Sequence, residues 1–176
     1  PPRPFEPGKP VSLVIFGGRS TLGNMPTLDT AAHRELYIRL FDELAALREH
    51  HPVDVYFKPP RGLTGEHEHW LFQTVGKTAG WKPIYQHSLR LELPNMVFAS
   101  VSMGTSALIE GLTRGVPGFV VREFPPVRDY TTLDAEAFPI VPAAEAMELL
   151  AKATTAEGYD ELVARELHHM KDELGL

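Results

Sequence analysis

The chain has 176 residues, a net charge of −6 and no cysteine. Its 43% hydrophobic and 23% charged residues are typical of a globular protein with a sizeable core. The missing cysteines exclude disulfides, thiolate metal sites and cysteine nucleophiles, and the negative charge argues against a broad nucleic-acid surface. The sequence has no apolar stretch of the ~18 residues that a membrane span needs and no signal-peptide pattern at its start, so the expected location is the cytoplasm.

The first ten residues hold five prolines and form the first expected unit. Each proline fixes φ and removes a backbone donor, which favours a semi-extended segment. We therefore expect a linker at 1–10, joined to an amino-terminal partner domain in a longer protein, and one domain at 11–176. The missing initiator methionine agrees with this expectation.

Apolar runs alternate with helical patterns along the rest of the chain. The run at 11–16 (VSLVIF) is typical of a strand buried on both faces, and Leu36, Leu40 and Leu44 recur at helical spacing and predict a helix at 31–48. The alternation predicts an α/β fold with a doubly wound, mostly parallel Rossmann-like sheet of about six strands and helices on both faces. The other expected strands are 53–57, 83–86, 96–101, 118–121 and 138–141; the other expected helices are 64–79, 104–114, 143–152 and 159–173, with a helical turn at 88–93.

The segment 96–121 (MVFASVSMGTSALIEGLTRGVPGFVV) carries the most functional information. A buried strand leads through a small polar turn into a helix, and ligands of open α/β sheets bind at the carboxyl ends of the strands. Unpaired N–H groups and the dipole of a helix N-terminus favour an anion such as a pyrophosphate. Glu110, one turn into the helix, could accept both hydroxyls of a ribose. The expected phosphate-binding residues of this turn are Ser102, Gly104, Thr105 and Ser106.

A plainer interpretation of the same segment stays open. Serine and threonine before a helix are common N-caps. Glu110 could also pair with Arg114, four residues later on a solvated face.

The pattern Ser-x-Gly-Thr-Ser-x-x-x-Glu-Gly-Leu-x-x-Gly-Val-Pro at 102–117, followed by an apolar strand, resembles the carboxy-terminal domain of GT-B glycosyltransferases. The resemblance implies one half of a GT-B fold. It implies that Gly104, Thr105 and Ser106 face the donor diphosphate and that Glu110 binds the donor ribose. It gives no reason to expect a metal or a cofactor, because the nucleotide-sugar is the substrate.

Two further loops at the predicted ligand edge carry basic residues. Gly18, Arg19 and Ser20 follow the first strand, where an arginine can hold phosphate in a bidentate contact. Lys58 and Arg61 follow the second strand in a Lys-Pro-Pro-Arg segment, similar to the Lys-Pro-His-Pro segment of the GT-B domains but without its histidine. The alternative for both loops is a solvated turn.

Charged residues also follow the fifth strand. Arg122, Arg128 and Asp129 are expected to face the cleft, and an arginine at this strand end is similar to the nucleotide-sugar 2-epimerases. The turn at 102–106 lacks the double glycine of that family. A surface loop with paired charges is the alternative for these residues.

The histidines predict no metal site. His67 and His69 stand two residues apart in a segment that looks helical, and such residues do not face each other. The pairs at 50–51 and 168–169 fall at helix ends, where a histidine complements the dipole.

Together with the resemblance, these observations predict the donor-binding domain of a glycosyltransferase that moves a sugar from a nucleotide-sugar to a carbohydrate acceptor hydroxyl. The resemblance implies bacterial surface polysaccharide synthesis, and it implies that the general base comes from the partner domain. No catalytic residue is therefore assigned, and the isolated domain is expected to be inactive. Two alternatives stay open: half of a nucleotide-sugar 2-epimerase or hydrolase, and a non-catalytic interaction domain.

Overall fold

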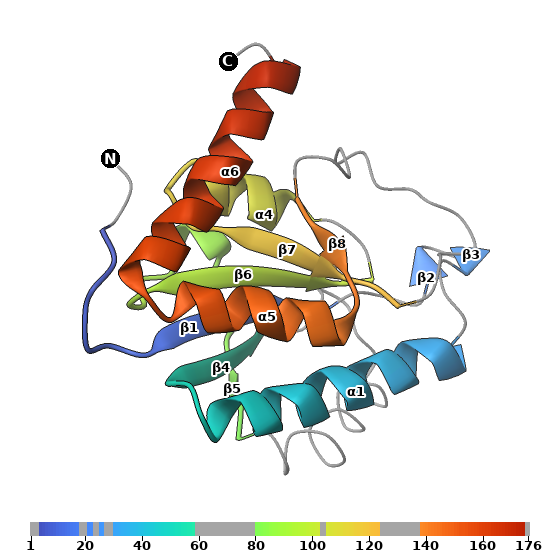
Figure 1. The fold of residues 1–176 in the computed structure, drawn as a ribbon. Coiled ribbons are helices and arrows are strands. Elements are labelled where there is room, and N and C mark those ends of the chain that lie inside the picture. Colours follow the sequence, from blue (N-terminus) through green and yellow to red (C-terminus); the bar gives the residue numbers. More distant parts are fainter. Residues whose placement is uncertain are drawn as a thin grey trace.

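The computed structural model describes residues 4–17, 21–22, 25–26, 30–58, 80–102, 105–123 and 138–174. Six strands form one sheet in the order β5-β4-β1-β6-β7-β8, and all neighbouring pairs are parallel (Figure 1). Numbered along the chain within this sheet, the order is 3-2-1-4-5-6, which is that of the Rossmann fold. The predicted fold class is confirmed. The strands are β1 (Val11–Phe16), β4 (Val53–Lys58), β5 (Lys82–Pro83), β6 (Met96–Val101), β7 (Gly118–Val121) and β8 (Ile140–Val141).

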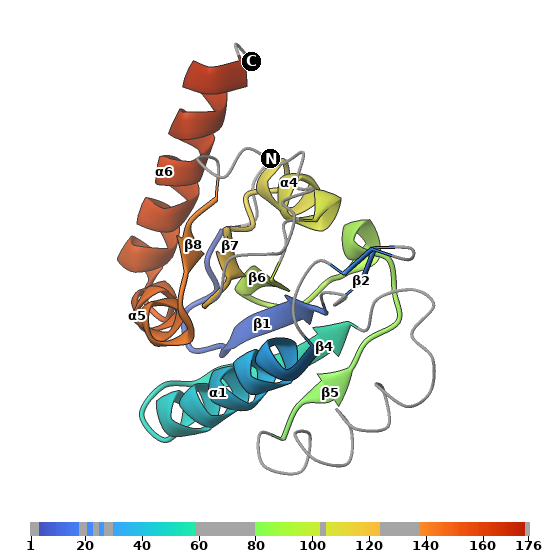
Figure 2. The ribbon, with the colours of Figure 1, turned by 90° about the vertical axis from the view of Figure 1, so that its right-hand side faces the viewer.

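Helices cover both faces of the sheet, as predicted (Figure 2). α1 and α5 pack on one face, and α4 with the 3₁₀ turn η2 packs on the other. α6 borders both layers, since its Leu162 joins the first core and its Leu167 packs against the second. The helices of the described residues are α1 (Thr30–Arg48), η2 (Ser88–Arg90), α4 (Ser106–Leu112), α5 (Ala143–Ala153) and α6 (Ala156–Leu174).

The continuous apolar run of β1 has a direct structural reason. Leu13 and Ile15 belong to the core under α1 and α5, whereas Val14 and Phe16 belong to the core under α4. Successive side chains of a strand point to opposite faces. Both sets must therefore be apolar in a sheet that is covered on both sides.

Several element boundaries differ from those expected. β5 and β8 are two residues long, because both are edge strands that pair on one side only. α6 begins at Ala156, ahead of the expected residue 159, since the Thr155 hydroxyl accepts from Gly158 N at 3.1 Å and caps the first turn. A short antiparallel ribbon, β2 (Thr21–Leu22) with β3 (Met25–Pro26), lies where only a loop was expected. The expected helix 64–79, including His67 and His69, lies outside the described residues.

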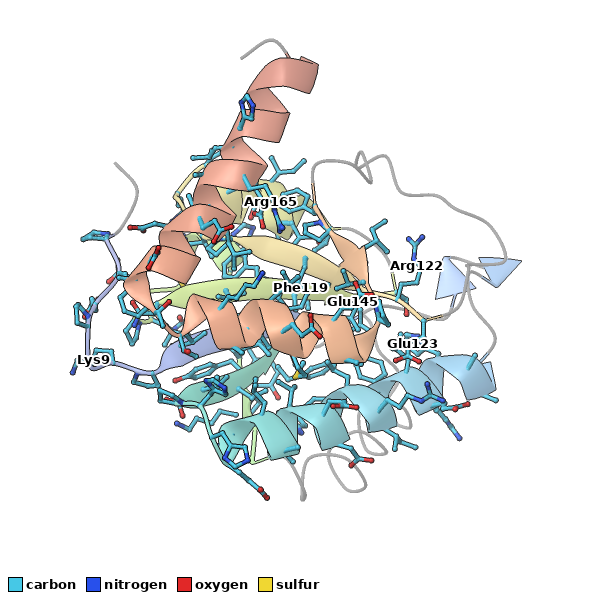
Figure 3. The ribbon with its side chains drawn as sticks, in the orientation of Figure 1. Lys9, Phe119, Arg122, Glu123, Glu145 and Arg165 are labelled. Carbon is cyan, nitrogen blue, oxygen red and sulfur yellow. The ribbon has the colours of Figure 1, made fainter. Side chains whose placement is uncertain are left out.

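The described part of the predicted linker is held against the sheet by one asparagine. Asn95, just before β6, accepts from Glu6 N at 2.7 Å and donates to the carbonyls of Glu6 and Lys9 at 3.0 and 3.1 Å. The Phe5 ring packs on Tyr159 with 5.6 Å between centroids. Lys9 and Arg122 lie at opposite ends of the strands (Figure 3), so the arm is attached at the amino edge of the sheet.

Candidate functional site

The carboxyl edge of β1 and β6 is where this topology offers a ligand crevice. β1 is followed by α1 on one face and β6 by α4 on the other, so the chain diverges between these neighbouring strands. Open α/β sheets bind ligands at such a switch point. Gly17, directly after β1, donates its N–H to the Lys58 carbonyl at 2.9 Å, which also ties the end of β4 to this edge.

Ser102, the first residue after β6, is the centre of the described part of this edge. Its φ of 70° is left-handed and is unusual for a residue other than glycine. Its N–H donates to Val121 O at 2.8 Å, and its carbonyl accepts from Arg122 Nε at 2.9 Å. Its Oγ lies 3.2 Å from His33 Nδ1. Residues held in such a conformation by their surroundings cluster at binding and active sites.

His33 is a residue of the site that the sequence did not reveal. It lies in the first turn of α1 and is fully buried, with its ring edge-on to Tyr37 at 5.0 Å. Positions 33, 37, 40 and 44 share one helix face, so His33 extends the buried stripe of α1 by one turn. A histidine in line with an otherwise apolar stripe is the signal that could have identified it.

Two charged residues follow β7 and connect the edge to its neighbours (Figure 3). Arg122 is half-buried and contacts the Ser102 carbonyl through Nε. Glu123 forms an ion pair with Arg39 of α1 at 2.6 Å and accepts from Ala143 N, the first residue of α5, at 3.3 Å. The beginning of the loop after β7 is thus fixed to two helices.

The start of α4 combines a cap with an exposed hydroxyl. Thr105 has extended backbone, and its Oγ1 accepts from Ala107 N at 3.4 Å, so the N-cap interpretation is confirmed for this residue. Ser106, the first residue of the helix, is exposed. The helix runs from Ser106 to Leu112, shorter than the expected 104–114.

The plainer interpretation of this segment pairs Glu110 with Arg114. In the structure both side chains contact η2, and Arg114 also contacts the residue after it. The Glu110 carboxylate accepts from the Ser88 hydroxyl. Arg114 donates to the carbonyls of Ser88 and Leu91 at 3.0 and 2.9 Å. The Glu110 side chain is therefore held in one place by a buried serine that is 22 residues away in sequence.

The segment between β5 and η2 is anchored at the same edge. Lys58 Nζ, at the end of β4, donates to the Gln86 carbonyl. Next to this contact, Tyr85 is 69% exposed, and Leu89 within η2 is 51% exposed. The segment thus presents large side chains to solvent while its backbone is fixed by Lys58 and Arg114.

The structure brings a subset of the predicted site residues together. Ser102 and Arg122 are in direct contact. Thr105 caps the adjoining helix α4, which contains Ser106 and Glu110. Lys58 reaches the segment that contacts Glu110. The remaining predicted residues lie outside the described part of the chain: Gly18, Arg19, Ser20, Arg61, Gly104, Arg128 and Asp129.

The most strongly shifted carboxyl group lies away from this edge. Glu166 of α6 is 3% exposed, and its carboxyl group accepts from Gly118 N, at the amino end of β7, at 3.0 and 3.2 Å. Burial raises the pKa of Glu166 to about 8, against the hydrogen bond from Gly118 and the charge of Arg165, which lower it. Burial also raises the pKa of Tyr159, whose hydroxyl donates to Met96 O at 2.7 Å. Both groups serve the packing of α6.

The described residues provide neither a cluster of metal ligands nor a membrane-spanning helix. Within the ranges given above, no group of three or more His, Asp or Glu side chains is arranged to hold a metal ion. Nor does any helix in those ranges have the length and apolar composition to cross a bilayer.

The sequence matches no known protein-family model and no curated protein.

Proposed function

We propose that this chain is the donor-binding domain of a glycosyltransferase, which holds a nucleotide-sugar while the sugar moves to an acceptor hydroxyl. The observation that carries the proposal is the position of Ser102. It begins the connection from β6 to α4 at the switch point of a 3-2-1-4-5-6 sheet, in contact with Arg122. Nucleotide ligands bind at this point in doubly wound folds.

The phosphate end of the donor would lie at the start of α4. Ser106 offers an exposed hydroxyl there, and Arg122 adds a permanent positive charge beside Ser102. Donor cleavage leaves a nucleoside diphosphate whose negative charge grows as the bond to the sugar breaks. Fixed donors and positive charge at that position stabilise the transition state.

The nucleoside end would lie between α4 and η2. Glu110 uses one carboxylate oxygen on the Ser88 hydroxyl, and a carboxylate has acceptor capacity for two ribose hydroxyls besides. Tyr85, exposed on the segment that leads to Ser88, provides an aromatic face for a base. One side of the sheet edge could thus hold phosphate and the other ribose and base.

The acceptor and the general base would belong to an amino-terminal partner domain, and bacterial surface polysaccharide synthesis is the process we propose. A second candidate is half of a nucleotide-sugar 2-epimerase or hydrolase. The contact of Arg122 with the turn favours it, since the comparable strand of that family also ends in arginine. Turnover of a nucleotide-sugar without any acceptor would distinguish the second candidate from the first.

Calorimetric titration with UDP, GDP, CDP and CMP tests the proposal. We expect one nucleotide to bind, and Glu110→Ala and Ser106→Ala each to weaken that binding by about tenfold, as for the loss of a hydrogen bond to a charged group. Glu161→Ala, which removes an exposed carboxylate of α6, is the matched control and should leave binding unchanged. Binding of none of the four nucleotides, or equal loss in the control, would contradict the proposal.

A further inference from the structure

Ser102 is held by three contacts, two from the end of β7 and one from α1, and this arrangement needs an explanation. Its N–H bonds β7 through Val121, its carbonyl bonds Arg122, and its hydroxyl meets His33 of α1. The left-handed φ of 70° costs free energy for any residue with a Cβ, so it persists only where the surroundings impose it. The three contacts are those surroundings.

The contact with His33 is the one that crosses the switch point. His33 comes from the helix after β1, whereas Ser102 follows β6, and the two residues are 69 positions apart in sequence. The edge-on Tyr37 ring fixes the plane of the imidazole. A movement of α1 would therefore be transmitted to Ser102, and through its carbonyl to Arg122.

The Ser102–His33 pair is shielded from solvent. Ser102 is 2% exposed and His33 is 0% exposed. A buried polar pair can often be replaced by apolar groups of similar shape at little cost, whereas removal of one partner leaves the other unsatisfied. We therefore expect the specific effect of the pair to lie in the geometry of the backbone at Ser102 rather than in stability.

We propose that His33 is a positioning residue of the donor-phosphate site: it fixes Ser102 and thereby the approach of Arg122 to a nucleoside diphosphate. This inference rests on the proposed function. His33 acts through Ser102 and does not itself contact the ligand. Its effect should fall on the terminal phosphate, since Arg122 lies at that end of the proposed site.

Four variants separate positioning from packing. His33→Asn can keep a polar group near the position of Nδ1 and so preserve the contact with Ser102. His33→Leu removes that contact, and the double variant His33→Leu/Ser102→Ala removes both members of the pair, so neither is left facing an apolar replacement of the other. Ser102→Gly accepts the left-handed backbone without strain but loses the hydroxyl.

The readout is the ratio of the affinities for a nucleoside diphosphate and its monophosphate, measured with UDP/UMP, GDP/GMP and CDP/CMP, together with the urea midpoint of each variant. We expect the wild-type protein to prefer the diphosphate. His33→Leu and the double variant should reduce that preference by about tenfold, and His33→Asn should keep it within about threefold. A loss of packing alone would lower both affinities together and leave their ratio unchanged.

The outcomes separate this inference from the proposed function. Binding of a nucleotide with an unchanged diphosphate preference in His33→Leu, in the double variant and in Ser102→Gly would overturn the role of His33 and leave the donor site standing. A wild-type protein that binds the nucleoside diphosphate and monophosphate equally well would also overturn the role of His33 and leave the donor site standing. Failure of the wild-type protein to bind any of the six nucleotides would overturn both. Should His33→Leu not fold, the double variant and Ser102→Gly decide the matter.

Discussion

The Nε of Arg122 donates to the carbonyl of Ser102 at 2.9 Å, so the residue that follows β7 is joined to the residue that follows β6. The two strands are parallel neighbours, and Val101 pairs with Val121 at their ends. A charge that follows one strand is thereby held beside the turn that follows the other. This relationship connects two predicted site residues that are 20 positions apart in sequence.

Arg122→Lys tests whether this contact matters for ligand binding. Lysine keeps the positive charge but has no Nε donor and no planar fork, so it cannot reproduce the contact with Ser102 while facing a phosphate. If the proposed donor site is correct, we expect affinity for the bound nucleoside diphosphate to fall by about tenfold. Arg165→Lys, at an exposed position of α6, is the matched control. Equal affinities of the two variants would argue against Arg122 as a ligand.

The central strands could be predicted to the residue because their signal is local. Val11–Phe16, Met96–Val101 and Gly118–Val121 are apolar runs that end at glycine or polar residues, as strands covered on both faces require. The edge strands were predicted too long. Their ends depend on where a neighbouring strand stops, which a single segment of sequence does not encode.

The candidate site likewise has residues that a local sequence pattern predicts and residues that it does not predict. Ser102, Thr105 and Glu110 follow from a continuous strand–turn–helix pattern, and the structure brings them to one sheet edge. His33 belongs to the site through its contact with Ser102, 69 residues away in sequence, and Ser88 through its contact with Glu110, 22 residues away. No local spacing relates such pairs, so only the folded chain identifies them.

Asn95→Ala should release the amino-terminal arm. The side chain makes three hydrogen bonds to Glu6 and Lys9, and Asn95 itself has a left-handed φ of 46°, which alanine tolerates less well. We expect the free energy of unfolding to fall by about 2 kcal/mol or more. Hydrogen exchange at Glu6 N–H should accelerate. Asn95→Gly relieves the backbone strain and loses only the hydrogen bonds, so it should be destabilised less than Asn95→Ala. Unchanged hydrogen exchange at Glu6 N–H in both variants would show that the Asn95 side chain does not hold the arm.

Gly111→Ala should destabilise α4 despite the higher helix propensity of alanine. A Cβ at this position would lie 2.6 Å from Cδ2 and 2.9 Å from Cε2 of Phe98. Overpacking of this kind costs about 1–3 kcal/mol, more than the gain of about 1 kcal/mol from propensity. Urea unfolding measures the difference. In a Phe98→Leu background the clash is relieved, so Gly111→Ala should become neutral or stabilising there; the same cost in both backgrounds would show that Phe98 is not the cause.

Glu166 should give the protein a stability that decreases as the pH rises. Its pKa is about 8 in the folded protein, above the ordinary value of 4.5, so between these values the folded state holds a proton that the unfolded state has lost. The contribution of the protonated carboxyl group is fully present below the unfolded pKa and is lost as the pH rises through the folded pKa.

Glu166→Gln removes this titration while keeping the acceptor for Gly118 N–H. The free energy of unfolding of the wild-type protein relative to Glu166→Gln should therefore fall with pH, by up to about 1.4 kcal/mol per pH unit within the window. Urea unfolding at intervals between about pH 5 and about pH 8 measures this slope. Glu161→Gln, which makes the same exchange at an exposed carboxylate on the same helix, is the matched control. A flat difference for Glu166→Gln would mean that the carboxyl group is already ionised at the lower end of the range, and that the contact with Gly118 holds it as a carboxylate.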